Sequence, residues 1–196
     1  MPDTGAPWNI PYVASTDLVS DWPADSLALA NAIDSGLDAA NAGIGTNVVQ
    51  TVKTDTFSAS LAGGAETTIT GLSVTITPTS ASSLVLVLLS VSATSTDRPA
   101  VKLLRGGTAV FVGDAAGNRI RMTAADSGSN APENAGSINF VGLDSPATTS
   151  ATTYTVNMRH ASSSTNSVYV NRGATDTDAG RTQRTVSSIT AIEVAA

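Results

Sequence analysis

The apolar run over residues 83–92 contains no charged residue, no Gly and no Pro. It is too short to span a bilayer. A short run of this composition is typical of a strand that is buried on both faces, so we expect it at the centre of a β-domain.

Alternation of apolar and polar residues predicts further strands from about Thr46 onward. Residues 72–77 alternate with period two, and the turn that follows them predicts a core hairpin with residues 83–92. A Gly-Gly pair between residues 101–105 and 108–112 predicts a second, tight hairpin. The other expected strands are residues 47–54, 57–61, 66–70, 119–123, 137–143, 152–159, 167–172 and 187–194. Many short strands separated by turns predict an antiparallel, jelly-roll-like β-sandwich.

The strand expected at residues 187–194 carries Ile189, Ile192 and Val194. Such an apolar strand needs partners on both edges or a covering layer. We therefore expect it to be tied into the central sheet.

A helix is predicted for residues 25–40, with Asp21 as a candidate N-cap and Pro23 in the first turn. After Ser26, spacings of four and three form an a/d seam, whose members are Ala30, Ile33, Leu37 and Ala40. A short Ala-rich helix is marginal by itself. We expect it to bundle with copies of itself, as in a three-stranded coiled coil, or to lie on a partner. An amphipathic helix that covers the β-domain is the alternative.

The first 22 residues are Pro-rich and irregular, so they predict an arm without regular structure. Its apolar anchors are Trp8, Ile10, Pro11, Tyr12, Leu18 and Val19. Such a segment either packs on its own domain or docks on a larger assembly and becomes ordered there. We take the anchors as candidate docking residues.

Charge divides the chain near Gly45, after a short Gly-containing joint. The acidic residues before that point are Asp3, Asp17, Asp21, Asp25, Asp34 and Asp38, and no Lys or Arg accompanies them. The rest of the chain is formally neutral. We expect a docking arm and helix at residues 1–45 and a β-sandwich head at residues 46–196. No basic stripe exists to neutralise phosphates, so nucleic-acid binding is not expected.

Few residues are suited to catalysis or to metal binding. The chain has no Cys and one histidine, His160, and it lacks a Gly-x-Ser-x-Gly motif. We expect His160 to be an exposed or satisfied loop residue. Asp114 and the pair Asp176 and Asp178 are the best cation candidates, but Asx turns explain both stretches without a metal. The sequence therefore predicts no enzyme activity, no cofactor and no metal site.

Three arginines, Arg172, Arg181 and Arg184, flank the loop that carries Asp176 and Asp178. They could form ion pairs with those acids between subunits, or they could contact an anionic sugar.

A surface loop at residues 126–136 is long and rich in Ser, Gly, Asn and Pro, which makes it a candidate functional tip. If the head binds a receptor, the candidate contact residues are Asn130, Glu133, Asn134, Asn166 and Asn171.

Strings at the N-terminus resemble the N-terminal region of bacteriophage tail-fibre and related virion-appendage proteins. These strings are Gly-Ala-Pro-Trp-Asn-Ile-Pro-Tyr at residues 5–12, Thr-Asp-Leu-Val at 16–19 and Trp-Pro-Ala-Asp-Ser-Leu-Ala-Leu-Ala-Asn-Ala-Ile at 22–33. Residues 70–78 and 144–156 are similar, more loosely, to β-rich domains at the distal ends of such fibres.

The resemblance implies a short fibre or spike that is a homotrimer. Its N-terminal arm would bind other virion proteins of the tail, the portal region or the capsid, and its head would face host-surface polysaccharide. The protein would then be a virion component released by lysis, without a secretory signal or membrane insertion.

Two alternatives remain. Because no long repetitive shaft separates arm and head, the first alternative is a capsid decoration or cement protein, or a head fibre. A polysaccharide-degrading tailspike would need a carboxylate pair in a groove and usually a long parallel β-helix, and the sequence indicates neither.

Overall fold

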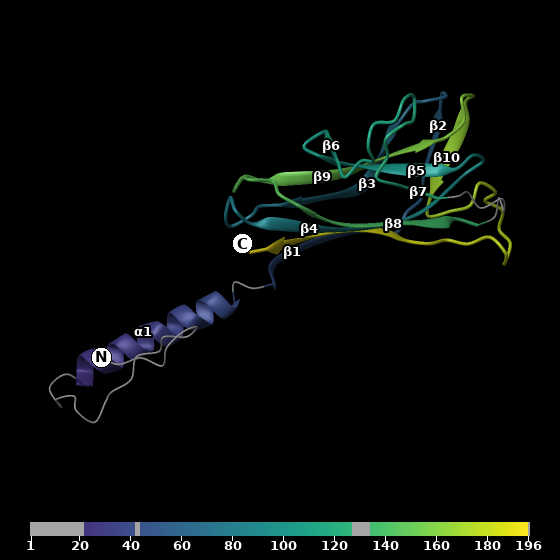
Figure 1. Ribbon diagram of the computed structural model, residues 1–196. Helices are drawn as coiled ribbons and strands as arrows, with labels where there is room; N and C mark the ends of the chain where they lie inside the picture. Colours follow the sequence, from purple (N-terminus) through teal and green to yellow (C-terminus); the bar gives the residue numbers. More distant parts are fainter. Residues whose placement is uncertain (1–21, 42–43, 127–133, 196) are drawn as a thin grey trace. The chain divides into compact units, whose positions relative to one another are not determined.

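The computed structural model describes residues 22–41, 44–126 and 134–195, and the chain forms two compact units, Met1–Thr46 and Asn47–Ala196. The described part of the first unit is dominated by one helix, α1 (Trp22–Asn41), shown in Figure 1. The sequence explains this helix: Pro23 sits in the first turn, where a missing N–H is harmless, and Ala and Leu favour the turns that follow. The helix predicted over residues 25–40 is present.

The second unit is built from antiparallel strands in two sheets (Figure 1). The strands are β1 (Ile44–Lys53), β2 (Phe57–Leu61), β3 (Thr67–Ile76), β4 (Leu84–Ser95), β5 (Pro99–Arg105), β6 (Thr108–Val110), β7 (Ala124–Ala125), β8 (Gly136–Asp144), β9 (Thr152–His160), β10 (Asn166–Val170) and β11 (Ser187–Val194). The six-stranded sheet has the order β1-β11-β4-β10-β2, and β8 also pairs with β4. The five-stranded sheet has the order β3-β9-β5-β6, and β7 also pairs with β5. The protein is therefore mainly β, as predicted.

Strand β4, which contains the apolar run, lies inside the six-stranded sheet and pairs with β8, β10 and β11. Its odd-numbered residues, such as Val85 and Val87, are fully buried between the sheets. Its even-numbered residues Leu84 and Leu86 are only partly buried, and Leu88 is exposed. The prediction of a central strand is confirmed. The prediction that both faces of this strand are buried is wrong for the single chain, because the other sheet covers only one face.

The predicted hairpin between residues 72–77 and 83–92 is wrong. Strand β3 pairs with β9, and β4 belongs to the other sheet, so the turn between them carries the chain from one sheet to the other. The hairpin predicted at the Gly-Gly pair is present as β5 and β6, and both Gly106 and Gly107 have positive φ, as a tight turn of this kind requires. The C-terminal strand is also confirmed in the sheet interior, because β11 lies between β1 and β4.

The core lies between the two sheets and follows from the period-two pattern of the strands. Its largest fully buried side chain is that of Tyr154 on β9. The other large, fully buried apolar residues are Ile69, Leu72, Ile76, Val85, Val87, Val91, Leu103, Ile138, Met158 and Ile189. Both sheets contribute residues to this core, so each sheet needs the other to bury its apolar face.

Polar side chains join the strands at the border of the core. Glu193 of β11 is buried, and its carboxylate accepts hydrogen bonds from the Thr79 backbone N–H at 2.7 Å, the Thr79 hydroxyl at 2.6 Å and the Asn47 amide at 2.9 Å. Burial raises the pKa of Glu193, but these hydrogen bonds and one from Ser83 outweigh it and lower the pKa to about 2. This carboxylate is therefore ionised in the folded protein at neutral pH.

Candidate functional site

The predicted docking residues Trp8, Ile10, Pro11, Tyr12, Leu18 and Val19 lie outside the described residues. The predicted seam lies on α1, where Ile33 and Leu37 are 45% and 62% exposed and Ala30 is also exposed. The side chain of Ala40 falls outside the described part. The helix thus carries large apolar side chains that its own turns leave exposed.

A second uncovered apolar surface lies on the outside of the six-stranded sheet. Residues directly opposite each other in an antiparallel pair point to the same side. Leu86 lies opposite Leu143 of β8 and Ile192 of β11, and Leu88 lies opposite Val141. The Gln50 amide donates to the Thr190 hydroxyl, which places alternate residues of β1 on the same side. We call this surface the outer apolar face; it consists of Val48, Val52, Leu84, Leu86, Leu88, Val141, Leu143, Ile192 and Val194.

Exposure on this face is high for residues of this type. Val141 is 63% exposed, Leu143 is 48% exposed, and Val48 and Val52 are 50% exposed each. The other residues that point outward from β1, β4, β8 and β11 are Ser, Thr, Asn or Gln, so the described part of this face carries no charge. A contiguous uncharged face with so many aliphatic side chains is typical of interaction surfaces.

Of the candidate receptor contacts, Asn130 and Glu133 lie outside the described residues. Asn134 is half-buried, and its backbone carbonyl accepts a 2.7 Å hydrogen bond from the Thr94 hydroxyl. Asn166 begins β10, and its side chain accepts a 2.9 Å hydrogen bond from Thr96. Asn134 and Asn166 therefore bind Thr94 and Thr96, which lie two residues apart at the end of β4.

Asn171 needs a correction, because its side chain is fully buried and cannot contact a receptor. Its amide donates to the backbone carbonyls of Lys53 and Asp55 at 2.8 and 2.9 Å, and its carbonyl accepts a 2.6 Å hydrogen bond from Ser187. Its φ is +61°, a backbone conformation that Asn adopts more readily than most residues. Asn171 therefore holds the β1–β2 connection against the segment that precedes β11.

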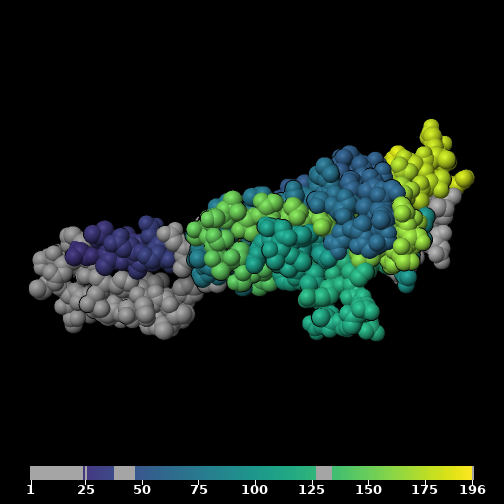
Figure 2. Space-filling view, turned by 90° about the horizontal axis from the view of Figure 1, so that it is seen from above, coloured from purple at the N-terminus to yellow at the C-terminus, as the bar shows by residue number. Residues whose placement is uncertain are grey.

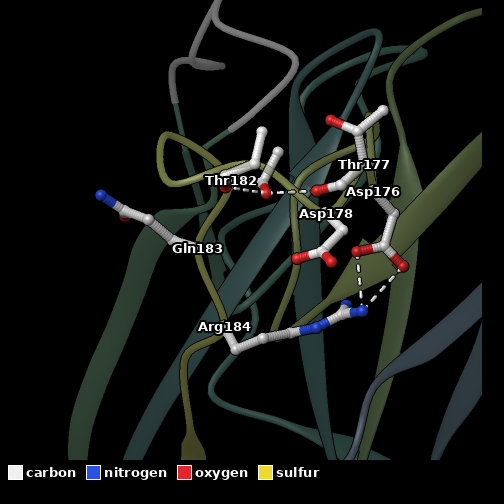
Figure 3. Close-up of a pocket in the computed structure, with 7 residues that line it drawn as sticks. Asp176, Thr177, Asp178, Thr182, Gln183 and Arg184 are labelled. Carbon is white, nitrogen blue, oxygen red and sulfur yellow. Dashed lines mark hydrogen bonds and ion pairs between the residues drawn. The ribbon is translucent and has the colours of Figure 1, made fainter.

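The loop that carries Asp176 and Asp178 forms an open hollow of about 350 Å³ (Figure 3). Asp176 accepts from Arg184 at 2.7 Å and from Arg172 at 3.1 Å, and Arg181 is engaged as well. The guanidinium of Arg172 also lies 4.9 Å from the centroid of the Tyr169 ring. These ion pairs form within one chain, so pairing between subunits is not needed to neutralise the loop, and Arg184 is already occupied by a carboxylate.

His160 was expected to be an exposed or satisfied loop residue, and exposure is wrong. The side chain is only 1% exposed, at the end of β9. Its Nε2 lies 3.0 Å from the Leu61 carbonyl oxygen, while its buried Nδ1 has no hydrogen-bond partner. Strand alternation turns it toward the sandwich interior, which an assignment to a loop could not anticipate.

Groups that could hold a metal ion are not found within residues 22–41, 44–126 and 134–195, since no three His, Cys, Asp or Glu side chains gather there. In the same residues, no helix has the length and apolar character needed to cross a membrane.

Comparison with known proteins gives no identification: no protein-family model matches the chain, and no curated protein is significantly similar to it.

Proposed function

We propose that this protein is a non-enzymatic structural component of a phage particle. It would be a short trimeric fibre or spike, anchored by its N-terminus to other virion proteins, whose β unit faces the host surface and its polysaccharide. In this proposal α1 forms a three-stranded coiled coil, and the β unit is a jelly-roll-like head. The resemblance of residues 5–33 to virion-appendage proteins supports the location on the particle.

The observation that carries the trimer is the outer apolar face. Its exposed valines and leucines cost free energy in water, at roughly 25 cal/mol for each Å² of apolar surface. In a ring of three copies each contact joins two different parts of the surface, and this uncharged face can supply both parts without like-charge repulsion. The exposed seam on α1 independently supports association of several copies of the chain.

The mass in solution tests this proposal. Sedimentation equilibrium of the full chain should give three times the 19.7 kDa chain mass. Val141→Glu puts a charge on the face, opposite Leu88, at a site that is already 63% exposed, so the chain should fold but its assembly should weaken at least tenfold.

Val186→Glu is the matched control, because Val186 is 58% exposed but lies outside the four strands that form the face. This variant should assemble as the unchanged chain does. A monomeric unchanged chain, or equal weakening by both variants, would contradict the trimer.

The place on the particle needs a separate measurement. Gold-labelled antibodies against residues 47–196 should decorate the tail or another appendage of intact particles in electron micrographs. Uniform labelling of the whole capsid would instead favour the decoration-protein alternative, for which the arm clamps neighbouring shell subunits.

A further inference from the structure

A pocket of about 440 Å³ opens on the five-stranded sheet, next to the segment between β6 and β7. That segment, residues 111–123, was predicted to contain a strand at residues 119–123, but the structure has none there. Figure 2 shows the teal-green chain around these residues projecting from the body of the β unit. The pocket is lined by Arg98, Ala100, Asn118, Arg119, Ile120, Met122, Arg159, His160 and Ala161.

Arg159 is the unusual member of this lining. Its side chain leaves β9 on the side opposite to the core, and yet the residue is only 4% exposed. The hydrogen bond recorded for its guanidinium is a 3.0 Å contact from Nε to the His160 carbonyl oxygen. No carboxylate pairs with it among the described residues. A buried cation without a counterion is costly, so this position is suited to receive an anion.

The neighbourhood has a surplus of positive charge. Arg119 donates only to the Ala116 backbone carbonyl, at 3.3 Å, and forms no ion pair with a described residue. Arg98 shares its charge with Asp97 at 3.1 Å and stands 65% exposed at the rim. No acidic side chain lines the pocket. Five other basic side chains of the β unit are paired with carboxylates, namely Lys53, Lys102, Arg105, Arg172 and Arg184, so the surplus lies in and beside this pocket.

The rest of the lining is apolar or amide. Ile120 is 53% exposed, although it is a large aliphatic residue, and Met122, Ala100 and Ala161 continue its surface. Asn118 adds an amide that can both donate and accept. Aliphatic side chains can pack against the C–H face of a sugar ring, and an amide suits its hydroxyls. A bare inorganic ion would leave this part of the lining unused.

We propose that this pocket binds an acidic sugar unit through its carboxylate. The paired N–H donors of Arg159 match a carboxylate, Arg119 adds a second cation, and Ile120 and Met122 contact the ring. Nothing in this inference requires the chain to be trimeric or to belong to a virion. It does differ from the candidate receptor loops, because none of their residues lines the pocket.

Titration calorimetry of the full chain at low salt tests the proposal, with methyl glucuronide as the acidic probe and methyl glucoside as its neutral match. The glucuronide should bind saturably, and the glucoside should bind at least tenfold more weakly. Arg119→Gln should weaken glucuronide binding about tenfold, since it removes a hydrogen bond to a charged group.

Arg121→Gln is the matched control. It removes the same charge from the same segment, but Arg121 does not line the pocket and donates to the Gly113 carbonyl instead. It should change binding less than twofold. Arg159→Gln should abolish binding; should that variant fail to fold, the Arg119 comparison still decides.

Three results would overturn the proposal: no saturable binding of the glucuronide, equal losses in the Arg119 and Arg121 variants, or tighter binding of inorganic phosphate than of the glucuronide. The second result would mean that only long-range attraction operates. The third would mean that the pocket is a general oxyanion site and not a sugar site.

Discussion

The hydroxyl of Tyr154 donates a 2.6 Å hydrogen bond to the carboxylate of Asp144, and this contact joins the two sheets. Asp144 ends β8 of the six-stranded sheet, and Tyr154 lies in β9 of the other. The same carboxylate accepts from Arg105 Nη1 at 2.8 Å. Burial, and then the hydrogen bond to Asp144, raise the pKa of the Tyr154 phenol, so it remains a donor across the whole neutral range.

Tyr154→Phe should lower the free energy of unfolding by about 2 kcal/mol, because Asp144 loses a buried, charge-assisted hydrogen bond while the ring keeps its packing. Urea unfolding followed by circular dichroism measures this change. Tyr169→Phe is the control, since no hydrogen bond is recorded for the Tyr169 hydroxyl, and it should stay within about 0.5 kcal/mol. Equal effects of the two substitutions would show that the Asp144 contact adds nothing.

Acid should destabilise the β unit through Glu193. Its pKa falls from 4.5 to about 2 on folding, so the folded state binds fewer protons than the unfolded state between those two values. Its contribution is therefore complete above about pH 4.5 and is lost as the pH drops toward 2.

Glu193→Gln removes this titration, so its melting temperature should be lower than that of the unchanged chain at pH 6 and should fall less steeply between pH 5 and pH 2, by the linkage argument. Melting curves of both proteins across this range make the comparison. Parallel curves would mean that other carboxylates carry the acid sensitivity.

Asn171→Ala should destabilise the chain by about 3 kcal/mol, because it leaves the Lys53 and Asp55 carbonyls without their donor and puts a Cβ-bearing, non-polar residue at positive φ. Asn171→Gly loses the same hydrogen bonds, but Gly adopts a positive φ readily, so this variant should be about 1 kcal/mol more stable than Asn171→Ala. Asn166→Ala, at a partly exposed site, serves as the control. If the Gly variant is less stable than the Ala variant, the backbone conformation is not the cause.

Deleting residues 189–196 should yield insoluble protein. The deletion removes most of β11 and the buried Ile189 and Ala191, so β1 and β4 lose their shared partner. Removing only residues 195–196, which follow the strand, should leave the protein soluble. Fractionation of the two truncated proteins after expression decides between these outcomes, and a soluble, folded deletion of residues 189–196 would mean that β11 is dispensable.

The period-two pattern was sufficient to predict most strands, because alternate side chains of a half-buried strand point to the core and to solvent and are apolar and polar accordingly. It predicted the interior position of β11 for the same reason. Pairing between strands was harder. Residues 72–77 and 83–92 are neighbours in sequence, but their partners lie far along the chain, and nothing local distinguishes a hairpin from a crossing between sheets.

The candidate sites show the same limit. The outer apolar face depends on four strands that are distant in sequence, so no single segment reveals it. The sequence indicates that Arg159 is a polar, outward-pointing residue of an alternating strand. Its burial depends on segments that are distant in sequence, such as residues 118–122. Asn171 was expected both within the strand at residues 167–172 and among the receptor contacts. Its burial depends on contacts with Lys53 and Asp55, which the sequence does not bring together.

The position of β11 between β1 and β4 also governs when this protein can fold. During synthesis, β1 emerges early and must wait for residues 187–194 before it gains its neighbour. Pairings between such distant segments are slow to form, and the unpaired strands remain exposed meanwhile. The β unit therefore matures after nearly all of its residues have left the ribosome, and slow expression at low temperature should favour its recovery in soluble form.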